Sequence, residues 1–384
     1  MREKKFESCS EINSTSKVNP QAHVILWHVK IHILEVVNGM GMGGAEKGLV
    51  ARLKHCPDFI STSVVNLNSR IDAITLSELK NIKVFTLKYL FKNIALLRIL
   101  KEVNPNVVVV RTPRDLVRLA FISKFAKKPT WKLVFEAHSN VVTTKVLLKL
   151  PMKLLLHRMS SKVDLTIAIS KNVSQGILCK KAKRIEIIYY GSDLEVPNSM
   201  YPNSLTPRLL FVGRLVAIKR PLWLLEQIKL LKELYSLPES FLMIVGSGPL
   251  QKRLVERISN LGLEREVKFF GFQEDVLPFM LSSTHLISPS LTEGLPITFY
   301  EAKLAGMRII TTPSGGGTEI LDNEDILLND FESDTFLRAL GKVIESGGVT
   351  KNERLEISSR SFWMRSSHLI PTYYDAISKL VKES

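Results

Sequence analysis

Two carboxylates stand eight positions apart around a Gly-Leu-Pro turn, in the segment SPSLTEGLPITFYE at residues 288–301. The apolar run 284–288 predicts a buried strand, and Pro296 is typical of the first residue of a helix. Glu293 is therefore expected on a loop and Glu301 on the helix. A helix N-terminus attracts a diphosphate, and a carboxylate inside it can accept hydrogen bonds from two ribose hydroxyls. The spacing suits a nucleotide-sugar site; the alternative is a pair of solvated acids.

Two cations follow another predicted strand. The apolar run 208–212 leads into Arg214 and Lys219, which precede a predicted amphipathic helix. Parallel sheets bind ligands at the carboxyl ends of their strands, so these cations could stabilise a diphosphate leaving group. A further strand at 241–245 runs into Gly246, which would let the backbone approach a ligand closely. Each signal is weak when it stands alone.

Further motifs extend over most of the chain. They are GGAE at 43–46, EAHS at 136–139, GRLVAIK at 213–219, VGSGP at 245–249, FFGF at 269–272 and EGLPITFYEA at 293–302. Together they resemble glycosyltransferase family 4, the retaining, nucleotide-sugar-dependent enzymes with the GT-B fold. The last motif is similar to that family's Glu, seven residues, Glu signature. The resemblance implies an α/β fold with two Rossmann-like, doubly wound parallel-sheet domains that face each other across a cleft.

The resemblance also implies a set of site residues. The catalytic residues would be His138, Glu293, Arg214 and Lys219, and the donor-binding residues would be Gly43, Gly44, Arg214, Lys219, Gly246, Gly271, Phe272, Glu293, Gly294, Leu295, Pro296, Ile297 and Glu301. Arg214 and Lys219 would hold the diphosphate and Glu301 the ribose. His138 would hydrogen-bond the donor sugar near its reacting carbon.

The remaining roles are also implied by the resemblance. Glu293 and the backbone of 294–297 would contact the sugar and phosphates, the turn at 271–272 the base, and Gly43 with Gly44 the diphosphate and acceptor. Members often carry Pro-Asn-Gly-Val-Asp after the strand expected at 185–189. This chain keeps the Gly and Asp as Gly191 and Asp193 but lacks the Asn. The resemblance therefore does not carry over any contact made through that Asn.

The length of 384 residues with 45% hydrophobic content predicts two domains. We expect a disordered extension at 1–29, and the family resemblance implies an acceptor-binding domain at 30–195, a donor-binding domain at 196–360 and a helix at 361–384 that crosses back to the first domain. Strands are expected at 31–37, 63–67, 84–87, 107–110, 133–135 and 165–169, and a linker lies within 194–207. Neither a secretory signal nor a membrane span is expected, and three scattered cysteines favour a reducing cytoplasm.

The net charge of +16 calls for an anionic partner or surface. Nucleic acid is disfavoured because no reading module is evident. Lysines recur every four residues beside leucines at 145–158, which suits an anionic membrane surface. The alternative is a helix that packs its leucines on its own sheet.

Other functions would use some of the same residues. Gly39, Gly41 and Gly44 also fit a dinucleotide fingerprint, but no acid ends the second strand, and an NAD(P)-dependent oxidoreductase leaves Arg214 and Glu301 unexplained. A nucleotide-sugar epimerase would use the same donor site and release free sugar, and a carrier or lectin-like protein would bind without turnover.

The leading interpretation is a metal-independent transferase without a cofactor. It would move sugar from a UDP-sugar, with GDP as the next choice, to a saccharide or lipid-linked saccharide acceptor. The expected context is bacterial surface-polysaccharide synthesis, such as O-antigen. The expected place is the cytoplasm, peripheral at the inner face of the membrane.

Overall fold

A computed structural model describes most of the chain from residue 30 onward. The described residues are 30–38, 44–68, 82–87, 92–122, 130–139, 161–176, 178–179 and 182–383. Gly39, Gly41, Gly43, the expected extension at 1–29 and the basic segment 145–158 lie outside the described residues. The predictions that concern them therefore stay predictions.

Seven parallel strands form the first sheet, in the order β3-β2-β1-β4-β5-β6-β7. They are β1 (Ile31–Val37), β2 (Ile60–Asn66), β3 (Lys83–Thr86), β4 (Val107–Val110), β5 (Lys132–Ala137), β6 (Leu165–Ala168) and β7 (Ile185–Ile187). All four valines of β4 are fully buried, as a strand covered on both faces requires. Every strand expected in this half is present, with ends that shift by at most three residues.

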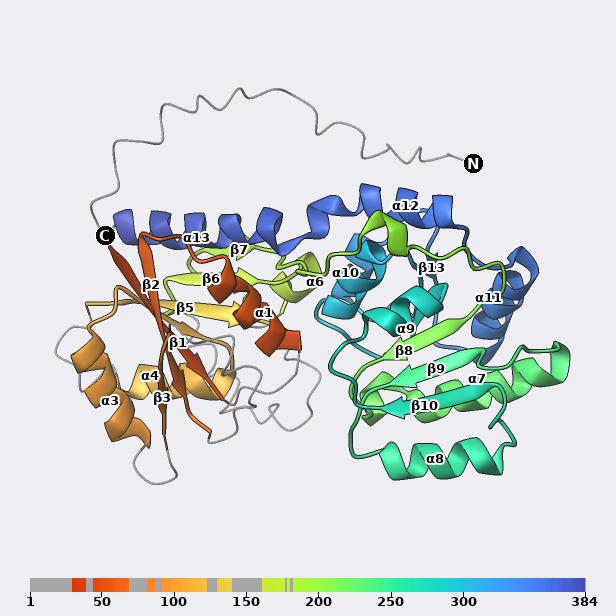
Figure 1. The fold of residues 1–384 in the computed structure, drawn as a ribbon. Coiled ribbons are helices and arrows are strands. Elements are labelled where there is room, and N and C mark those ends of the chain that lie inside the picture. Colours follow the sequence, from red (N-terminus) through yellow and green to blue (C-terminus); the bar gives the residue numbers. More distant parts are fainter. Residues whose placement is uncertain are drawn as a thin grey trace, which may run out of the picture. The chain divides into compact units, whose positions relative to one another are not determined.

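Helices cover both faces of this sheet. They are α1 (Gly44–Lys54), α3 (Lys92–Val103), α4 (Pro113–Ile122), α6 (Lys171–Ser174) and the C-terminal α13 (Ser366–Lys382). In Figure 1, α13 runs along one side of the sheet, and α3 with α4 lies on the other. Ile370, Tyr373 and Ile377 of α13 belong to the same hydrophobic core as the β1 and β4 side chains. The end of the chain therefore completes the core of its first half.

Six parallel strands form the second sheet, in the order β10-β9-β8-β11-β12-β13. They are β8 (Leu209–Val212), β9 (Leu242–Val245), β10 (Val267–Gly271), β11 (His285–Ser288), β12 (Arg308–Thr311) and β13 (Ile326–Leu327). Neighbouring residues of a strand point to opposite faces, so Leu209 and Phe211 enter one core while Leu210 enters another.

Each of these two cores is closed by its own helices. One uses α7 (Pro221–Leu234), α8 (Gln251–Asn260) and α11 (Ser333–Ser346), and the other uses α9 (Leu277–Ser282), α10 (Ile297–Leu304) and α12 (Lys351–Arg360). Short 3-10 turns are η4 (Asn198–Met200), η5 (Ala217–Lys219), η6 (Gly316–Ile320) and η7 (Phe362–Met364). The fold class is thus α/β with two parallel, doubly wound sheets, as predicted. We call β1–β7 with their helices the first half, and β8–β13 with theirs the second half.

One glycine marks the place where the chain passes the start of α13. Gly191 has a φ of 71°, and a Cβ there would lie 2.3 Å from the carbonyl oxygen of Met364. Ser192 N–H also donates to Met364 O, and Ser366 N–H donates back to Ser192 O. A side chain at position 191 would therefore clash with the backbone at the start of α13, which explains the glycine there.

Among the described helices, none combines the length and apolar character needed to cross a membrane.

Candidate functional site

The loop between β11 and α10 carries the first carboxylate. Glu293 N–H donates to Ser314 O at 2.7 Å, which ties this loop to the one after β12. Helix α10 begins at Ile297, and Pro296 precedes it in an extended conformation (φ −70°, ψ 127°). The prediction that Pro296 is the first helical residue was therefore wrong by one position, because its ψ keeps it outside the helix. Within the described residues, no side chain caps this N-terminus.

Glu301 lies in the second turn of α10 and is only 6% exposed. Lys47 of α1 donates from Nζ to Glu301 Oε1 at 3.0 Å. The other oxygen, Oε2, is buried and accepts no hydrogen bond from the described residues. A buried acceptor without a donor is costly, so this oxygen is a candidate partner for a ligand hydroxyl. Lys47 was missed by the sequence analysis, although it directly follows the GGAE motif.

The two cations have different surroundings. Lys219, at the end of η5, forms an ion pair with Glu293, whereas Arg214 is exposed after β8. Helix α7 then begins with Pro221 at its first position. Both cations thus follow the carboxyl end of β8, the neighbour of β11 in the sheet. The structure brings Lys219 and Glu293 together, and their roles toward a donor stay predictions.

The glycine turns serve different purposes. Gly246 has a φ of 143°, and a Cβ there would lie 1.9 Å from Gly213 O. Because Gly246 has no side chain, the backbone of Gly213 can lie close to it. The sequence had predicted a close approach of a ligand there, not of this backbone. Gly271 also has a positive φ, 69°, but faces open space, and the next residue, Phe272, is half exposed. Phe272 is available to contact a base, which is the role assigned to it.

Gly294 lies against the first half of the chain. A Cβ at Gly294 would meet His138 O at 2.0 Å, and Ser170 Oγ donates to Gly294 O at 3.1 Å. Leu295 packs on the cores of both halves. The Glu293 loop is therefore positioned by the ends of β5 and β6 as well as by its own sheet.

A glycine-rich turn after β12 makes further contacts across the halves. A Cβ at Gly316 would lie 1.8 Å from Gly294 O and 2.4 Å from Ser170 Oγ. Glu319 accepts hydrogen bonds from the N–H groups of Lys171 and Asn172, at 2.8 and 2.7 Å. This turn was not predicted from the sequence, although the Gly-Gly-Gly run at 315–317 could have indicated it.

His138 follows β5 at the carboxyl edge of the first sheet. Its Nε2 contacts Oε1 of Glu136, which is 1% exposed. Burial opposes ionisation of Glu136, but Arg111, Arg52 and His138 together outweigh it and hold the pKa of that carboxyl well below its usual range. The ring of His138 is thus held by an ionised carboxylate beneath it. Of the two glycines assigned to the other side of the site, Gly44 is exposed at the start of α1 and Gly43 lies outside the described residues.

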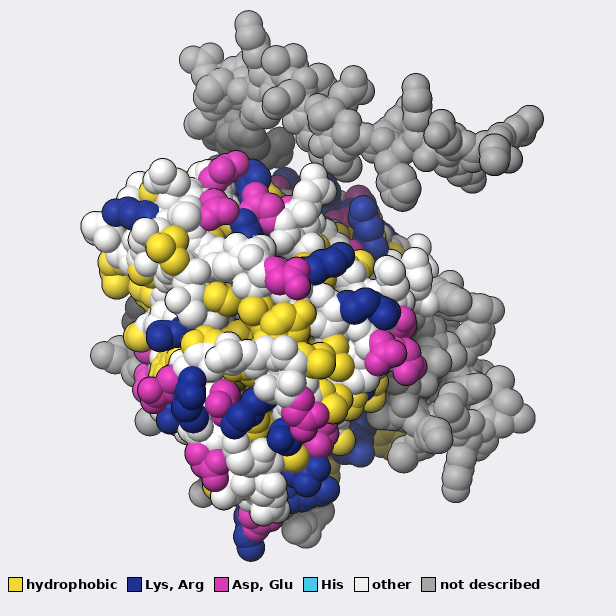
Figure 2. All heavy atoms as spheres, turned by 90° about the vertical axis from the view of Figure 1, so that its right-hand side faces the viewer, with side chains coloured by type: hydrophobic (Ala, Val, Ile, Leu, Met, Phe, Trp, Pro, Cys, Tyr) yellow, Lys and Arg dark blue, Asp and Glu magenta, His cyan; other side chains and the backbone are white. Residues whose placement is uncertain are grey.

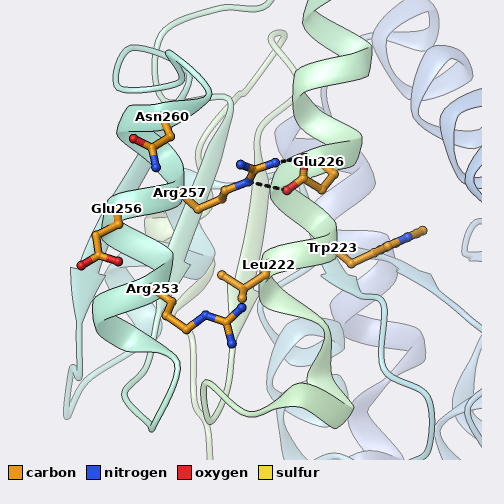
Figure 3. Close-up of a pocket in the computed structure, with 7 residues that line it drawn as sticks. All are labelled: Leu222, Trp223, Glu226, Arg253, Glu256, Arg257 and Asn260. Carbon is orange, nitrogen blue, oxygen red and sulfur yellow. Dashed lines mark hydrogen bonds and ion pairs between the residues drawn. The ribbon is translucent and has the colours of Figure 1, made fainter.

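A separate hollow of about 490 Å³ lies between α7 and α8. Figure 3 shows Arg257 of α8 bound to Glu226 of α7 across it. Its lining contains none of the predicted site residues; it is Leu222, Trp223, Glu226, Arg253, Glu256, Arg257 and Asn260. We assign it no part in the chemistry.

Surface charge and possible metal ligands concern two further expectations. On the face in Figure 2, Lys and Arg side chains lie interspersed with Asp and Glu around a hydrophobic area. Among the described residues of that face, basic side chains thus form no continuous patch. Within the described parts of the chain, no three His, Cys, Asp or Glu side chains gather as metal ligands do. Metal independence and membrane contact stay predictions.

Comparison with known proteins adds to this geometry. Residues 201–361 match the family model of glycosyl transferases group 1. The Escherichia coli UDP-Gal:alpha-D-GlcNAc-diphosphoundecaprenol alpha-1,3-galactosyltransferase is 32% identical over 139 residues, 35% of this chain and 35% of that protein. The D-rhamnosyltransferase WbpZ of Pseudomonas aeruginosa is 29% identical over 207 residues, 49% of this chain and 51% of its own length. The chain thus matches about a third of the first of these relatives and half of the second.

Solved structures agree on the fold. Anabaena HepE in complex with UDP and glucose superposes with a TM-score of 0.70 at 19% identity, over 92% of this chain and all of that one. The lipopolysaccharide outer core galactosyltransferase WaaB gives a TM-score of 0.69 at 19% identity, over 91% of this chain and 99% of its own. The architecture is therefore the GT-B fold. The part of the chain that matches the group 1 glycosyl transferase model, residues 201–361, carries Arg214, Lys219, Glu293 and Glu301.

Proposed function

We propose that this protein transfers a sugar from a nucleotide-sugar, a UDP-sugar in the first instance, to a saccharide or lipid-linked saccharide acceptor. The carboxylate of Glu301 is the observation that carries the proposal. It is buried on α10, one oxygen meets Lys47 and the other accepts nothing from the described residues. Two adjacent ribose hydroxyls can satisfy both oxygens at once.

The two cations stabilise the leaving group in this proposal. Departure of a nucleoside diphosphate places negative charge beside Arg214 and Lys219, and preorganised cations stabilise such charge. The N-terminus of α10, which no side chain of the described residues caps, adds a partial positive charge. Glu293 holds Lys219 before the donor arrives. These groups can act without a metal ion, so we propose a metal-independent reaction.

The finer assignments rest on family resemblance and on the relatives. Retention of configuration, with acceptor attack on the face that the diphosphate leaves, follows the family 4 resemblance. Among the relatives, one enzyme is named for UDP-Gal and a diphosphoundecaprenol-linked acceptor, and HepE was solved with UDP. We therefore place this protein in bacterial surface-polysaccharide assembly, with its acceptor at the inner face of the membrane. An anionic membrane contact remains part of this proposal.

A donor screen tests the proposal. The purified protein is incubated with UDP- and GDP-sugars, with and without EDTA, and nucleotide release is measured. Release from one donor that survives EDTA is expected, and the variant Arg214→Ala should lose it while staying folded, because that side chain is exposed. Release of free sugar in an epimerised form would identify an epimerase instead. No nucleotide binding at all would refute the donor site.

A further inference from the structure

Four charged side chains lie buried beneath His138. We call them the quartet: Glu35 of β1, Arg52 of α1, Arg111 after β4 and Glu136 of β5. Their side chains are 3%, 1%, 9% and 1% exposed, respectively. The quartet holds two positive and two negative charges, which satisfies the rule that buried charges are paired.

Each carboxylate of the quartet is bound by both arginines. Glu35 meets Arg52 at 3.3 Å and Arg111 at 2.7 Å. Glu136 meets Arg111 at 3.3 Å and also pairs with Arg52. Removing either carboxylate would therefore leave the same two guanidinium groups with one partner fewer. The two glutamates thus share their arginine partners, although Glu136 interacts more strongly with both arginines than Glu35 does.

The two glutamates differ in their third contact. The hydroxyl of Tyr373, on α13, donates to Glu35 Oε1 at 3.4 Å. Glu136 Oε1 instead contacts His138 Nε2. An ionised carboxylate only accepts hydrogen bonds, so the contact requires a hydrogen on Nε2. Only Nδ1 of that ring is then left for a substrate hydroxyl.

We infer that Glu136 is a positioning residue: it orients the His138 ring and places a proton on Nε2, so that Nδ1 is the nitrogen that meets the donor sugar. This inference rests on the proposed function, because it assumes that His138 contacts the donor. It assigns the quartet a second task besides holding β1, α1, β4 and β5 together. Glu35 carries only the structural task.

The first test needs no donor. The ring nitrogens of His138 are observed by NMR on histidine-labelled protein, with His138→Asn to assign the signal. A proton on Nε2 is expected in the wild type. A neutral ring with its proton on Nδ1 would overturn the inference, whatever the outcome of the donor screen.

The second test uses the pair of glutamates. With the donor found in the screen, Glu136→Gln should lower kcat on the order of 10- to 100-fold, the cost of misplacing a group at the reacting centre, with little change in KM. Glu35→Gln removes the same charge from the same arginines and should keep kcat within about threefold. Equal loss of kcat in the two variants would show that the quartet acts on stability alone.

A double variant shows whether Glu136 acts through His138. Adding Glu136→Gln to His138→Asn should lower kcat no further, because the ring that Glu136 holds is already absent. Multiplicative losses would overturn the inference. If the wild type turns over no donor while the Nε2 proton is present, the proposed function fails and the positioning contact stands.

Discussion

Replacing Lys47 by methionine should tighten donor binding. Lys47 Nζ lies 3.0 Å from Oε1 of Glu301, the carboxylate that we assign to the ribose. A ribose that bonds to both oxygens competes with this ammonium group for Oε1. Methionine keeps an apolar side chain of similar reach but brings no charge, so Lys47→Met leaves Oε1 free before the donor arrives.

The size of the effect follows from the exposure of the pair. The Lys47 side chain is 39% exposed and that of Glu301 is 8% exposed. Solvent weakens such a half-exposed pair to about 0.5 to 1 kcal/mol. The variant should therefore bind the donor about two to five times more tightly. The donor-free protein should lose a similar amount of stability.

Calorimetric titration with UDP measures the change, because UDP carries both the ribose and the diphosphate. Lys252→Met is the matched control: it removes the same charge from α8, where the side chain is 90% exposed and its nearest acid is Glu256 at 3.9 Å. Unchanged affinity is expected for the control. Weaker UDP binding by Lys47→Met would refute the reasoning and indicate that Lys47 itself holds the phosphates.

Three further predictions concern the site and its supports. Glu301→Gln should weaken UDP binding by about 1 to 3 kcal/mol in the same titration, because a ribose hydroxyl loses a charged acceptor; unchanged affinity would remove the assignment. Gly316→Ala should lower the free energy of unfolding in urea by about 1 to 3 kcal/mol, because its Cβ would overlap Gly294 O and Ser170 Oγ; a fully stable variant would contradict the packing. Burial lowers the pKa of His285 from 6.5 to about 3, so the unfolded chain alone takes up a proton between these values and stability falls as the pH drops below 6.5. His285→Gln should reduce the stability lost between about pH 7.5 and about pH 5.5 by about 1.4 kcal/mol, and urea unfolding that shows the same loss in both proteins would disprove it.

Local pattern was enough to predict the strands of the first sheet and β8, β9 and β11 of the second. The four consecutive valines of β4 and the apolar runs of β8 and β9 are short and bounded by polar residues or glycines, as buried parallel strands are. The strand-end rule then placed Arg214, Lys219 and Glu293 at one edge. The structure puts Lys219 and Glu293 in contact at that edge.

Contacts between distant parts of the chain could not be predicted from the sequence. Lys47 and Glu301 are 254 positions apart, and Ser170 and Gly294 are 124 apart. No periodicity or local spacing links such residues, since their approach depends on how one half of the chain packs on the other.

The negative charges of the two carboxylates in the signature are balanced by lysines from different halves of the chain. Glu293 pairs with Lys219 of its own half, whereas Glu301 pairs with Lys47 of the other. A donor that binds both carboxylates therefore competes with one ion pair within the second half and one between the halves. Gly294, packed against His138 O, adds a contact that leaves no room for a Cβ. The family match covers only the second half, so it accounts for the residues that would hold the donor but not for those of the first half that keep Glu301 and Gly294 in place.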